Sequence, residues 1–424
     1  MRNFIHGNSV KSAATGVVAA LVLISASAGV ASAADPVDHV DHDQRGRLLS
    51  VTEVAELSSG QVQAAVEPFF GDTGRVRYGV TGYRITYMTI DPRGRPTIAS
   101  GLVVLPIGVG GDLRVISYDH GTNPTRDAVA SVTAGGGDRE AVELFASAGY
   151  AVVAPDYLGL GTGPGEHPYM DLASEVTASE DMLDASRVLA ARAGVTLDPR
   201  VLVTGFSQGG PAAMGFARAI QEGRAGTYWR LGAVAPISGP YDVRSAEIPA
   251  LLRNELNPES EVLYISFWTV AMNRLYHFYD NPTEVFQQPY ASIVEGLYDG
   301  DHTEQEILSA LPNSPSALLT PQYVARLRQP MGRLEQAMAQ SDDSCDWHPD
   351  APTQIYAADG DDGVAFANSR QCQAAFAVHG DQVRLVDVGD VDHNTSAKLS
   401  VPQVLAFLTE ARWSTETSST WSPA

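Results

Sequence analysis

Two periodicities of apolar and polar positions run along this 424-residue chain. Residues 82–91 and 97–106 alternate in apolar character around the turn Pro92-Arg93-Gly94-Arg95, which predicts a β-hairpin. After the hairpin, short apolar runs typical of buried strands are separated by segments whose apolar residues recur at helical spacing. The predicted strands are residues 114–118, 150–155, 200–204 and 231–237, and the predicted helices are residues 138–147, 177–193 and 211–221.

Strands that are apolar throughout and alternate with helices predict an α/β fold, with a mostly parallel central sheet flanked by helices on both faces. We expect regular structure to begin near Val76, because the residues before it are polar and weakly patterned. The alternation stops at about Gly239 and resumes near residue 353. The resumed pattern predicts strands at residues 353–357 and 383–388 and helices at residues 364–377 and 401–412.

Between the two parts of the sheet, aromatic residues are spaced at mixed intervals of three and four. This spacing predicts an inserted helical cap over the carboxyl ends of the strands, where open α/β sheets place their sites. We expect a minority of these aromatics to contact substrate, since others must form the core of the cap. The aromatic residues of the insertion are Tyr264, Phe267, Trp268, Tyr276, Phe278, Tyr279, Phe286 and Tyr290.

The first 33 residues have the composition of an export signal. Arg2 and Lys11 precede an apolar stretch at residues 13–30, which ends at the small-residue cleavage pattern Ala31-Ser32-Ala33. An uncleaved transmembrane anchor is the alternative, but Gly and Ser residues interrupt the stretch and no later segment reaches membrane-spanning length. We therefore predict a secreted protein with no integral membrane segment after cleavage. The predicted division is a signal peptide (1–33), an N-terminal segment (34–74), the first part of the core (75–240), the cap (241–350), the second part of the core (351–413) and a flexible tail (414–424).

The chain is strongly acidic, with 28 basic and 50 acidic residues and a formal charge of −22. Cleavage after Ala33 removes Arg2 and Lys11 but no acid, so the mature chain has 26 basic residues and a charge of −24. Such a chain repels phosphates, which argues against a nucleic acid partner. The acids at 359–362 lack the spaced ligands and closing Glu of a calcium loop, and those near 38–44 and 299–306 are expected in a solvated tail and an exposed loop, so we expect no metal site.

The chain has two cysteines, Cys345 and Cys372, separated by 27 residues. In an oxidising compartment this pair predicts a disulfide bond, and two buried free thiols are the alternative. Neither cysteine has the neighbouring His or Cys residues of a zinc site.

The segment 200–216 carries the most specific chemistry of the sequence. A short apolar strand leads into Gly-Phe-Ser-Gln-Gly at residues 205–209, and an apolar helix follows. In this context the strand-to-helix turn exposes the hydroxyl of Ser207 as a nucleophile, while Gly205 and Gly209 keep side chains away from the crossing backbones. A fortuitous turn is the alternative.

A serine hydroxyl needs a base within hydrogen-bond reach, and the base needs an orienting acid, in the chain order serine, acid, histidine. His393 is the candidate base because it follows a late strand and precedes the last helix, whereas His379 is expected at a helix end on the surface. The turn after the strand at residues 353–357 offers Asp359, Asp361 and Asp362, and the spacing Asp-x-x-Val selects Asp361 as the acid.

Acyl transfer also needs backbone donors for the developing oxyanion. The amide of Gln208, next to the nucleophile, is one candidate. The loop Tyr118-Asp-His-Gly-Thr122 should supply the second donor, from the amide of Thr122 or alternatively from that of Gly121. His120 in this loop is expected to brace it rather than to act as a base, and Asp156 after the next strand is likewise expected to have a bracing role.

Together these motifs resemble secreted, cap-bearing lipases and esterases of the α/β-hydrolase superfamily. The resemblance rests on YDHGT at 118–122, VVAPDYLGLG at 152–161, HPY at 167–169, GFSQGG at 205–210 and the late DGDDG and DH turns. It implies an α/β-hydrolase fold, a Ser207/Asp361/His393 triad, hydrolysis of small-molecule or lipid carboxylic esters, and no cofactor. This sequence departs from the usual pattern at Ala357-Ala358, where related chains carry His-Gly, and the cap matches no motif.

Two other functions remain open on the sequence. A secreted serine aminopeptidase or amidase would use the same triad, with cap acids such as Glu255, Glu259 or Glu261 holding the substrate amine. A non-catalytic binding protein on the same scaffold is disfavoured, because the complete triad order is present. Secretion and an aromatic-rich cap favour esters with apolar acyl groups.

Overall fold

The computed structural model describes residues 44–342 and 344–411. The predicted signal peptide (1–33), the start of the N-terminal segment and the predicted tail (414–424) lie outside the described residues.

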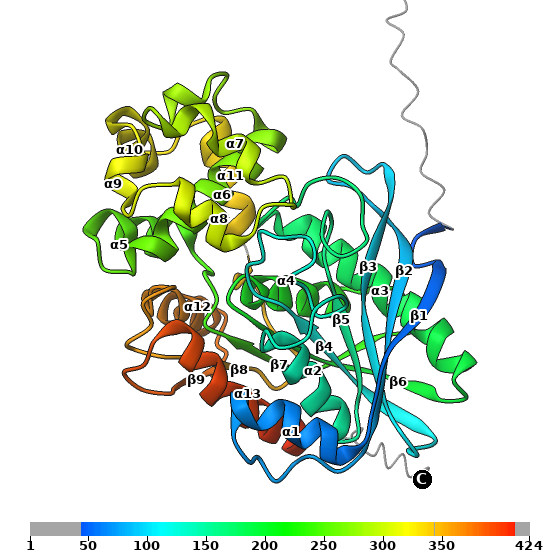
Figure 1. Ribbon diagram of the computed structural model, residues 1–424. Helices are drawn as coiled ribbons and strands as arrows, with labels where there is room; N and C mark the ends of the chain where they lie inside the picture. Colours follow the sequence, from blue (N-terminus) through cyan, green and yellow to red (C-terminus); the bar gives the residue numbers. More distant parts are fainter. Residues whose placement is uncertain (1–43, 343, 412–424) are drawn as a thin grey trace, which may run out of the picture. The chain divides into compact units, whose positions relative to one another are not determined.

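The described part of the chain forms a nine-stranded sheet (Figure 1). Its strands are β1 (Leu48–Leu57), β2 (Val80–Ile90), β3 (Pro96–Pro106), β4 (Asp112–Asp119), β5 (Ala151–Pro155), β6 (Thr196–Phe206), β7 (Arg230–Ile237), β8 (Gln354–Ala357) and β9 (Arg384–Asp387). The strand order is β1-β2-β3-β5-β4-β6-β7-β8-β9. β1, β2 and β3 pair antiparallel, β3 runs antiparallel to β5, and every pairing from β5 to β9 is parallel. The sheet is therefore mostly parallel with an antiparallel edge, as the sequence predicts.

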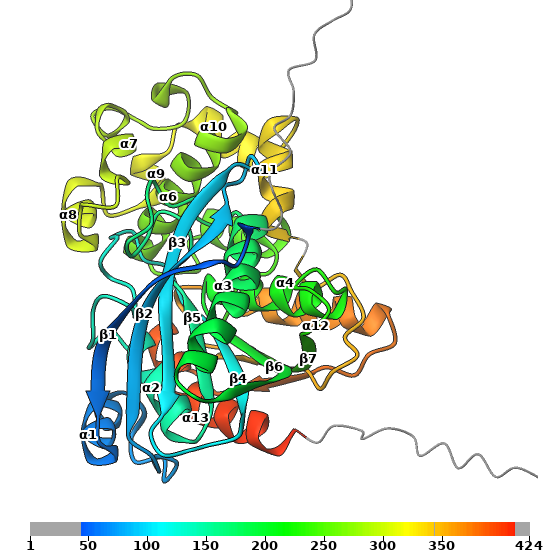
Figure 2. The same ribbon diagram turned by 90° about the vertical axis from the view of Figure 1, so that its right-hand side faces the viewer.

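Helices cover both faces of this sheet (Figures 1 and 2). They are α1 (Ser59–Phe70), α2 (Asp138–Ser147), α3 (Leu172–Arg192), α4 (Gly209–Gln221), α12 (Ala367–Val378) and α13 (His393–Glu410). On one face, α3, α4 and α12 bury residues such as Met182, Phe216 and Phe376 in one apolar core. On the other face, α1, α2 and α13 form a second core that includes Phe145 and Leu405. Burial of these two apolar layers drives the sheet and helices together.

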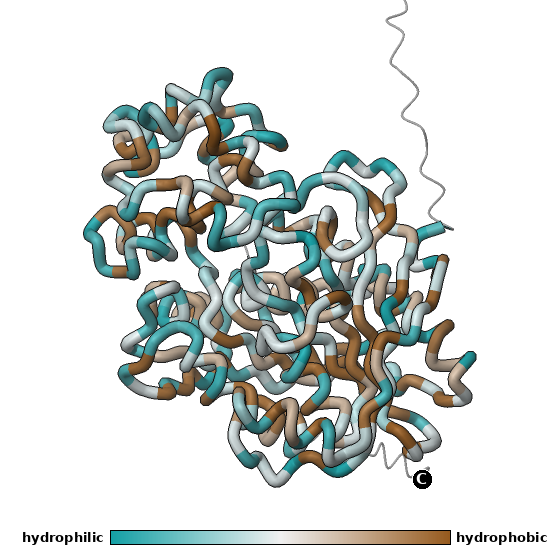
Figure 3. Tube along the Cα trace, in the orientation of Figure 1, coloured by the Kyte–Doolittle hydropathy of each residue, from teal (hydrophilic) through white to brown (hydrophobic). Residues whose placement is uncertain are grey.

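The insertion between β7 and β8 is helical. Its α-helices are α5 (Ile248–Arg253), α6 (Pro258–Tyr276), α7 (Val294–Leu297), α8 (Glu304–Ala310), α9 (Pro315–Leu318), α10 (Pro321–Arg328) and α11 (Arg333–Asp342). They share an apolar core of their own, with Phe267 and Tyr323 fully buried in it. Figure 3 shows hydrophobic segments along these helices as well as along the central strands. Most aromatics of the insertion thus serve its packing, as expected from their spacing.

Each strand and helix predicted between residues 82 and 237 is present, but regular structure does not begin near Val76. β1 and α1 precede that residue, so this prediction was wrong. β1 is an edge strand without a single buried residue, and α1 buries Val62 and Val66 alone, so neither carries a strong apolar pattern. The capping box formed by Ser58 and Gln61 is the signal in the sequence that marks the start of α1.

A disulfide bond joins Cys345 and Cys372 and so ties the segment after α11 to α12. Both cysteines are buried in the core that α3, α4 and α12 form with the sheet. Among the helices of the described residues, none combines the length and apolarity that crossing a bilayer demands.

Candidate active site

Ser207 occupies the sharp turn between β6 and α4. Its φ of 56° lies in the left-handed region, which side chains other than glycine rarely adopt. A Cβ atom on Gly205 would overlap the carbonyl of Gly209, and one on Gly209 would overlap the carbonyl of Asp119. The backbone amide of Ser207 donates to the carbonyl of Ile237 at 3.0 Å. The turn has the geometry of a nucleophile elbow, with the serine held at the carboxyl end of β6.

The structure brings Ser207, His393 and Asp361 into one hydrogen-bonded chain. His393 Nε2 lies 2.8 Å from Ser207 Oγ, and His393 Nδ1 lies 2.9 Å from each carboxylate oxygen of Asp361. Because an ionised carboxylate accepts but cannot donate, Asp361 holds the imidazole proton on Nδ1 and leaves Nε2 to accept from the serine. All three side chains are buried, and the ring of Phe206 packs against the imidazole with centroids 4.6 Å apart.

Among the three aspartates of the turn after β8, Asp361 is the one that contacts the imidazole. Its Oδ1 also accepts the amides of Gly363 and Val364, each at 2.9 Å, which locks the carboxylate in place. Asp362 accepts the backbone amide of His393 at 3.2 Å, and Asp359 is exposed. The spacing-based choice of Asp361 agrees with this geometry.

The sequence pattern suggested that His393 lies in a loop before the last helix, but the structure places it elsewhere. It is the first residue of α13, which Asp392 caps by accepting the amide of Thr395. The prediction that the helix starts at residue 401 was wrong by eight residues. Pro402, a residue type common in the first turn of helices, lies inside α13 and explains the error.

Three backbone amides that could stabilise an oxyanion border Ser207. Those of Gln208, Thr122 and Gly121 donate no hydrogen bond to any described residue, so they are available to a ligand. Gln208 precedes the first turn of α4, where amides point outward and the helix dipole favours negative charge. A Cβ on Gly121 would lie 3.4 Å from Ser207 Cβ, which places this loop beside the nucleophile.

The side chain of Gln208 is held by a buried network of polar side chains. Its Nε2 donates to Glu175 Oε1 at 2.7 Å and lies 2.9 Å from His167 Nε2. His167 Nδ1 lies 2.9 Å from the carbonyl of Leu158, to which it donates, so its Nε2 is free to accept from Gln208. Burial lowers the pKa of His167 to about 3 and raises the pKa of Glu175 to about 8. Burial therefore favours the uncharged forms of both groups, and their hydrogen bonds hold the side chain of Gln208, the residue that follows Ser207.

The loop residues expected to have bracing roles do so. The ring nitrogens of His120 lie 2.6 Å from the carbonyl of Gly121 and 3.2 Å from that of Asp156. Asp156 is buried and accepts the hydroxyls of Ser100 and Ser131, both at 2.6 Å. These contacts hold the loop after β4 against the loop after β5.

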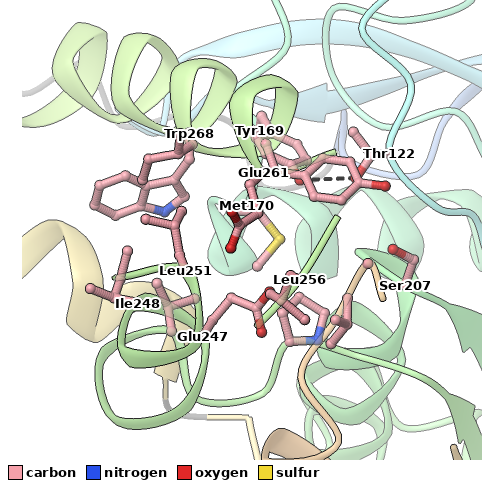
Figure 4. A pocket seen from close by; sticks show the side chains of 16 residues that line it. Thr122, Tyr169, Met170, Ser207, Glu247, Ile248, Leu251, Leu256, Glu261 and Trp268 are labelled. Carbon is pink, nitrogen blue, oxygen red and sulfur yellow. Dashed lines mark hydrogen bonds between the residues drawn. The ribbon is translucent and has the colours of Figure 1, made fainter. Parts of the chain in front are cut away.

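Ser207 lies where two hollows of different character meet. The first is an apolar pocket between the sheet and the helical insertion, bordered by Met170, Leu251 and Trp268 and containing two carboxylates, Glu247 and Glu261 (Figure 4). The second is a polar groove lined by residues that include His393, Asn123, Asp138, Asn394 and Lys398. Thr122, Ser207 and Tyr264 line both hollows, whereas His393 lines the groove and not the apolar pocket.

Several residues of the site carried no decisive signal in the sequence. Glu175 is one of many acids in a helix, and its partner Gln208 becomes informative only once the fold brings the two together. His167 belongs to the HPY motif that contributed to the resemblance, which is the signal that could have found it. Within the described residues, no cluster of three or more His, Cys, Asp or Glu side chains is arranged to hold a metal ion.

Solved structures with this architecture are similar to the chain over most of its length. A protein from Legionella pneumophila described as a hydrolase aligns over 87% of this chain and 100% of its own, with 27% identity and a TM-score of 0.79. The rice cell wall degrading esterase LipA from Xanthomonas oryzae aligns over 87% of this chain and 98% of its own, with 28% identity and a TM-score of 0.78.

Candida antarctica lipase A shares the fold more distantly, with 13% identity, a TM-score of 0.62 and coverage of 87% of this chain and 82% of its own. No protein-family model and no curated protein sequence matches the chain. The aminopeptidase alternative gains no support from these relatives. The chain has the α/β-hydrolase fold, a mostly parallel sheet flanked by helices, which it shares with an esterase and a lipase.

Proposed function

We propose that this protein is a secreted serine hydrolase of carboxylic esters, with Ser207 as nucleophile, His393 as general base and Asp361 as the orienting acid. The observation that carries the proposal is the continuous contact from Asp361 through His393 to Ser207, with atoms 2.9 and 2.8 Å apart. The described similarity to a hydrolase, an esterase and a lipase supports the same reaction class.

The geometry leads to a two-step reaction. Ser207 Oγ attacks the ester carbonyl carbon while its proton moves to His393 Nε2, and the carbonyl electron pair moves onto oxygen. The amide of Gln208, with that of Thr122 or Gly121, donates hydrogen bonds to this oxyanion. The bond to the alcohol oxygen then breaks, and His393 gives its proton to the departing alcohol.

The acyl-enzyme is released by the reverse sequence with water. A water molecule loses a proton to His393 Nε2 as its oxygen attacks the acyl carbon. The bond to Ser207 Oγ breaks, the serine recovers the proton from His393, and the carboxylic acid leaves. Asp361 stabilises the imidazolium in both steps, since its carboxylate stays within 2.9 Å of Nδ1.

The two hollows support an assignment of the two halves of the ester as part of the proposal. His393 must protonate the departing alcohol, so the alcohol lies on the side of the polar groove that His393 lines. The acyl chain then occupies the apolar pocket under the cap, whose walls include Leu251 and Trp268. We expect esters with apolar acyl chains and polar alcohols as substrates.

Labelling with a fluorophosphonate and a series of p-nitrophenyl acyl esters tests the proposal. Wild-type protein should incorporate one label at Ser207 and hydrolyse the esters, while Ser207→Ala should do neither. Aminoacyl-nitroanilides provide the contrasting substrate, because rapid anilide release without ester turnover would assign an aminopeptidase instead. A folded protein that takes up no label would point to a binding protein without catalysis.

Export is part of the same proposal. The buried disulfide fits an oxidising compartment. N-terminal sequencing of protein recovered from the culture medium should begin near Ala34. Membrane-bound protein that retains Met1 would contradict secretion.

A further inference from the structure

The apolar pocket under the cap contains a carboxylate that the proposed reaction does not use. Glu261, on α6, is 3% exposed, and its Oε1 has no hydrogen-bond partner among the described residues. Buried polar atoms in folded proteins are almost always satisfied, because an unpartnered one loses its hydration without compensation. Figure 4 shows the Glu261 side chain directed into the pocket beside Met170, with Ser207 at the far side.

The Glu261 side chain makes no capping hydrogen bond in its own helix. The N-cap of α6 is Asn257, whose side chain accepts the amides of Glu259 and Ser260 at 3.0 and 3.3 Å. The carbonyl oxygen of Asn257 accepts a hydrogen bond from the backbone amide of Glu261. The start of the helix is thus satisfied without the Glu261 carboxylate.

The second carboxylate of the pocket, that of Glu247, already accepts hydrogen bonds from the protein. Glu247 Oε2 accepts the side chain of Asn368 at 2.6 Å and the amide of Ala365 at 3.1 Å, and so it holds the segment that follows Asp361. Of these two carboxylates, Glu261 is therefore the one whose side chain makes no hydrogen bond with a described residue and is available to a hydrogen-bonding group on a bound molecule. The surrounding wall, which includes Ile248, Leu251 and Trp268, offers apolar contact.

We propose that Glu261 is a specificity-determining residue that recognises a hydroxyl group on the acyl chain of the substrate, so that the pocket favours hydroxylated acyl esters over plain ones. This inference rests on the proposed ester hydrolysis and on the assignment of the pocket to the acyl half. A hydroxyl can both donate to and accept from a carboxyl group, and this hydrogen bonding compensates for its burial among apolar side chains.

The charge state of the pocket favours a neutral hydroxyl over an ammonium group. Burial, with Glu247 nearby, raises the pKa of Glu261 to about 8, so the carboxyl is largely protonated at neutral pH. A neutral acid forms two complementary hydrogen bonds with a hydroxyl. An ammonium group would have to lose its hydration and would bind best to the ionised acid, which the raised pKa disfavours at neutral pH.

The test compares p-nitrophenyl esters of hydroxylated acids, with the hydroxyl at successive positions, against the unsubstituted and the amino-substituted esters. For one hydroxyl position, wild-type kcat/KM should exceed that of the plain ester roughly 10- to 100-fold. Glu261→Leu should abolish this preference and leave plain esters as good or better substrates. Glu261→Gln should retain most of it, because the amide still donates and accepts. Glu259→Gln, an exposed acid on the same helix, is the matched control and should behave as wild type.

Two results would overturn the proposal: a hydroxyl preference that survives Glu261→Leu, or no preference at any position. A preference for amino-substituted chains that Glu261→Gln destroys would assign a cation site instead. If no ester is cleaved and Ser207 takes up no label, the proposed function fails independently. The hydroxyl site is then decided by tryptophan fluorescence, because Trp268 lines the pocket: a free hydroxy acid that binds wild type and Glu261→Leu equally refutes it.

Discussion

Replacing Asp361 with asparagine exchanges one carboxylate oxygen for an NH₂ group and so turns a hydrogen-bond acceptor beside His393 into a donor. Asp361 Oδ1 accepts the amides of Gly363 and Val364, both at 2.9 Å, and these donors need an oxygen acceptor. In Asp361→Asn the amide oxygen must therefore keep this position, and the NH₂ group takes the place of Oδ2. It then lies about as far from His393 Nδ1 as Oδ2 does now, at 2.9 Å.

An NH₂ group at that position repels an Nδ1–H and donates to an unprotonated Nδ1, so it favours the tautomer with the proton on Nε2 over the one in which Nδ1–H donates to the remaining oxygen, also 2.9 Å away. Nε2 lies 2.8 Å from Ser207 Oγ and in the favoured tautomer can no longer accept the serine proton. The site is buried, so water does not readily substitute for the lost acceptor. We expect kcat to fall about 10³- to 10⁴-fold at neutral pH, which corresponds to about 4 to 5.5 kcal/mol of transition-state stabilisation.

Steady-state hydrolysis of a p-nitrophenyl ester measures this effect, with thermal unfolding as the check that the variant is folded. Asp359→Asn removes the same charge from an exposed position of the same turn and should retain wild-type kcat. The reasoning is refuted if Asp361→Asn keeps more than a tenth of wild-type kcat, or if Asp359→Asn suffers the larger loss.

Three further predictions concern the scaffold. Glu175→Leu removes the acceptor of the Gln208 side chain and should lower kcat about 10-fold or more, with a smaller change in KM. Glu175→Gln keeps an acceptor oxygen and should retain most of the activity. Similar kcat values for the two variants would contradict the positioning role. Burial raises the pKa of Glu175 to about 8 and that of Asp119 to about 7, whereas in the unfolded chain both groups lose their protons near pH 4. Between these pH values the folded state binds more protons than the unfolded state. The free energy of unfolding should therefore fall as the pH rises from about 4 to about 8. Urea unfolding at several pH values measures this fall, which Glu175→Gln should reduce and which a flat profile would disprove. Replacing Cys345 and Cys372 by alanine should lower the free energy of unfolding by about 3 kcal/mol and leave kcat within a few-fold, because the bond closes a loop of 27 residues in the core; an unchanged urea midpoint would argue against it.

Much of the scaffold follows from local sequence. The apolar runs of β4 to β7 are buried on both faces by helices, so their composition alone predicts a parallel sheet. The hairpin of β2 and β3 follows from alternation around a turn. Ser207 is equally local, because its strained turn needs glycines at fixed offsets that the sequence displays.

Two features were beyond such reasoning. The edge strand β1 has no buried residue and so a weak apolar signal, and the first half of α13 precedes a proline that local rules place in the first turn of a helix. In both cases pairing or packing with distant parts of the chain stabilises a segment that its own pattern does not specify.

The sequence by itself determined the order along the chain of the strands from β2 to β9, the strand-to-helix turn at Ser207 and the candidate triad residues. Tertiary structure decided that Asp361 lies within hydrogen-bond distance of His393, that Glu175 and His167 contact the Gln208 side chain, and that Glu261 Oε1 is buried with no partner among the described residues. These are relations between residues separated by many positions, such as Glu175 and Gln208, or Asp361 and His393. Hydrogen bonding and desolvation depend on distances of a few ångströms, and only the folded chain sets those distances.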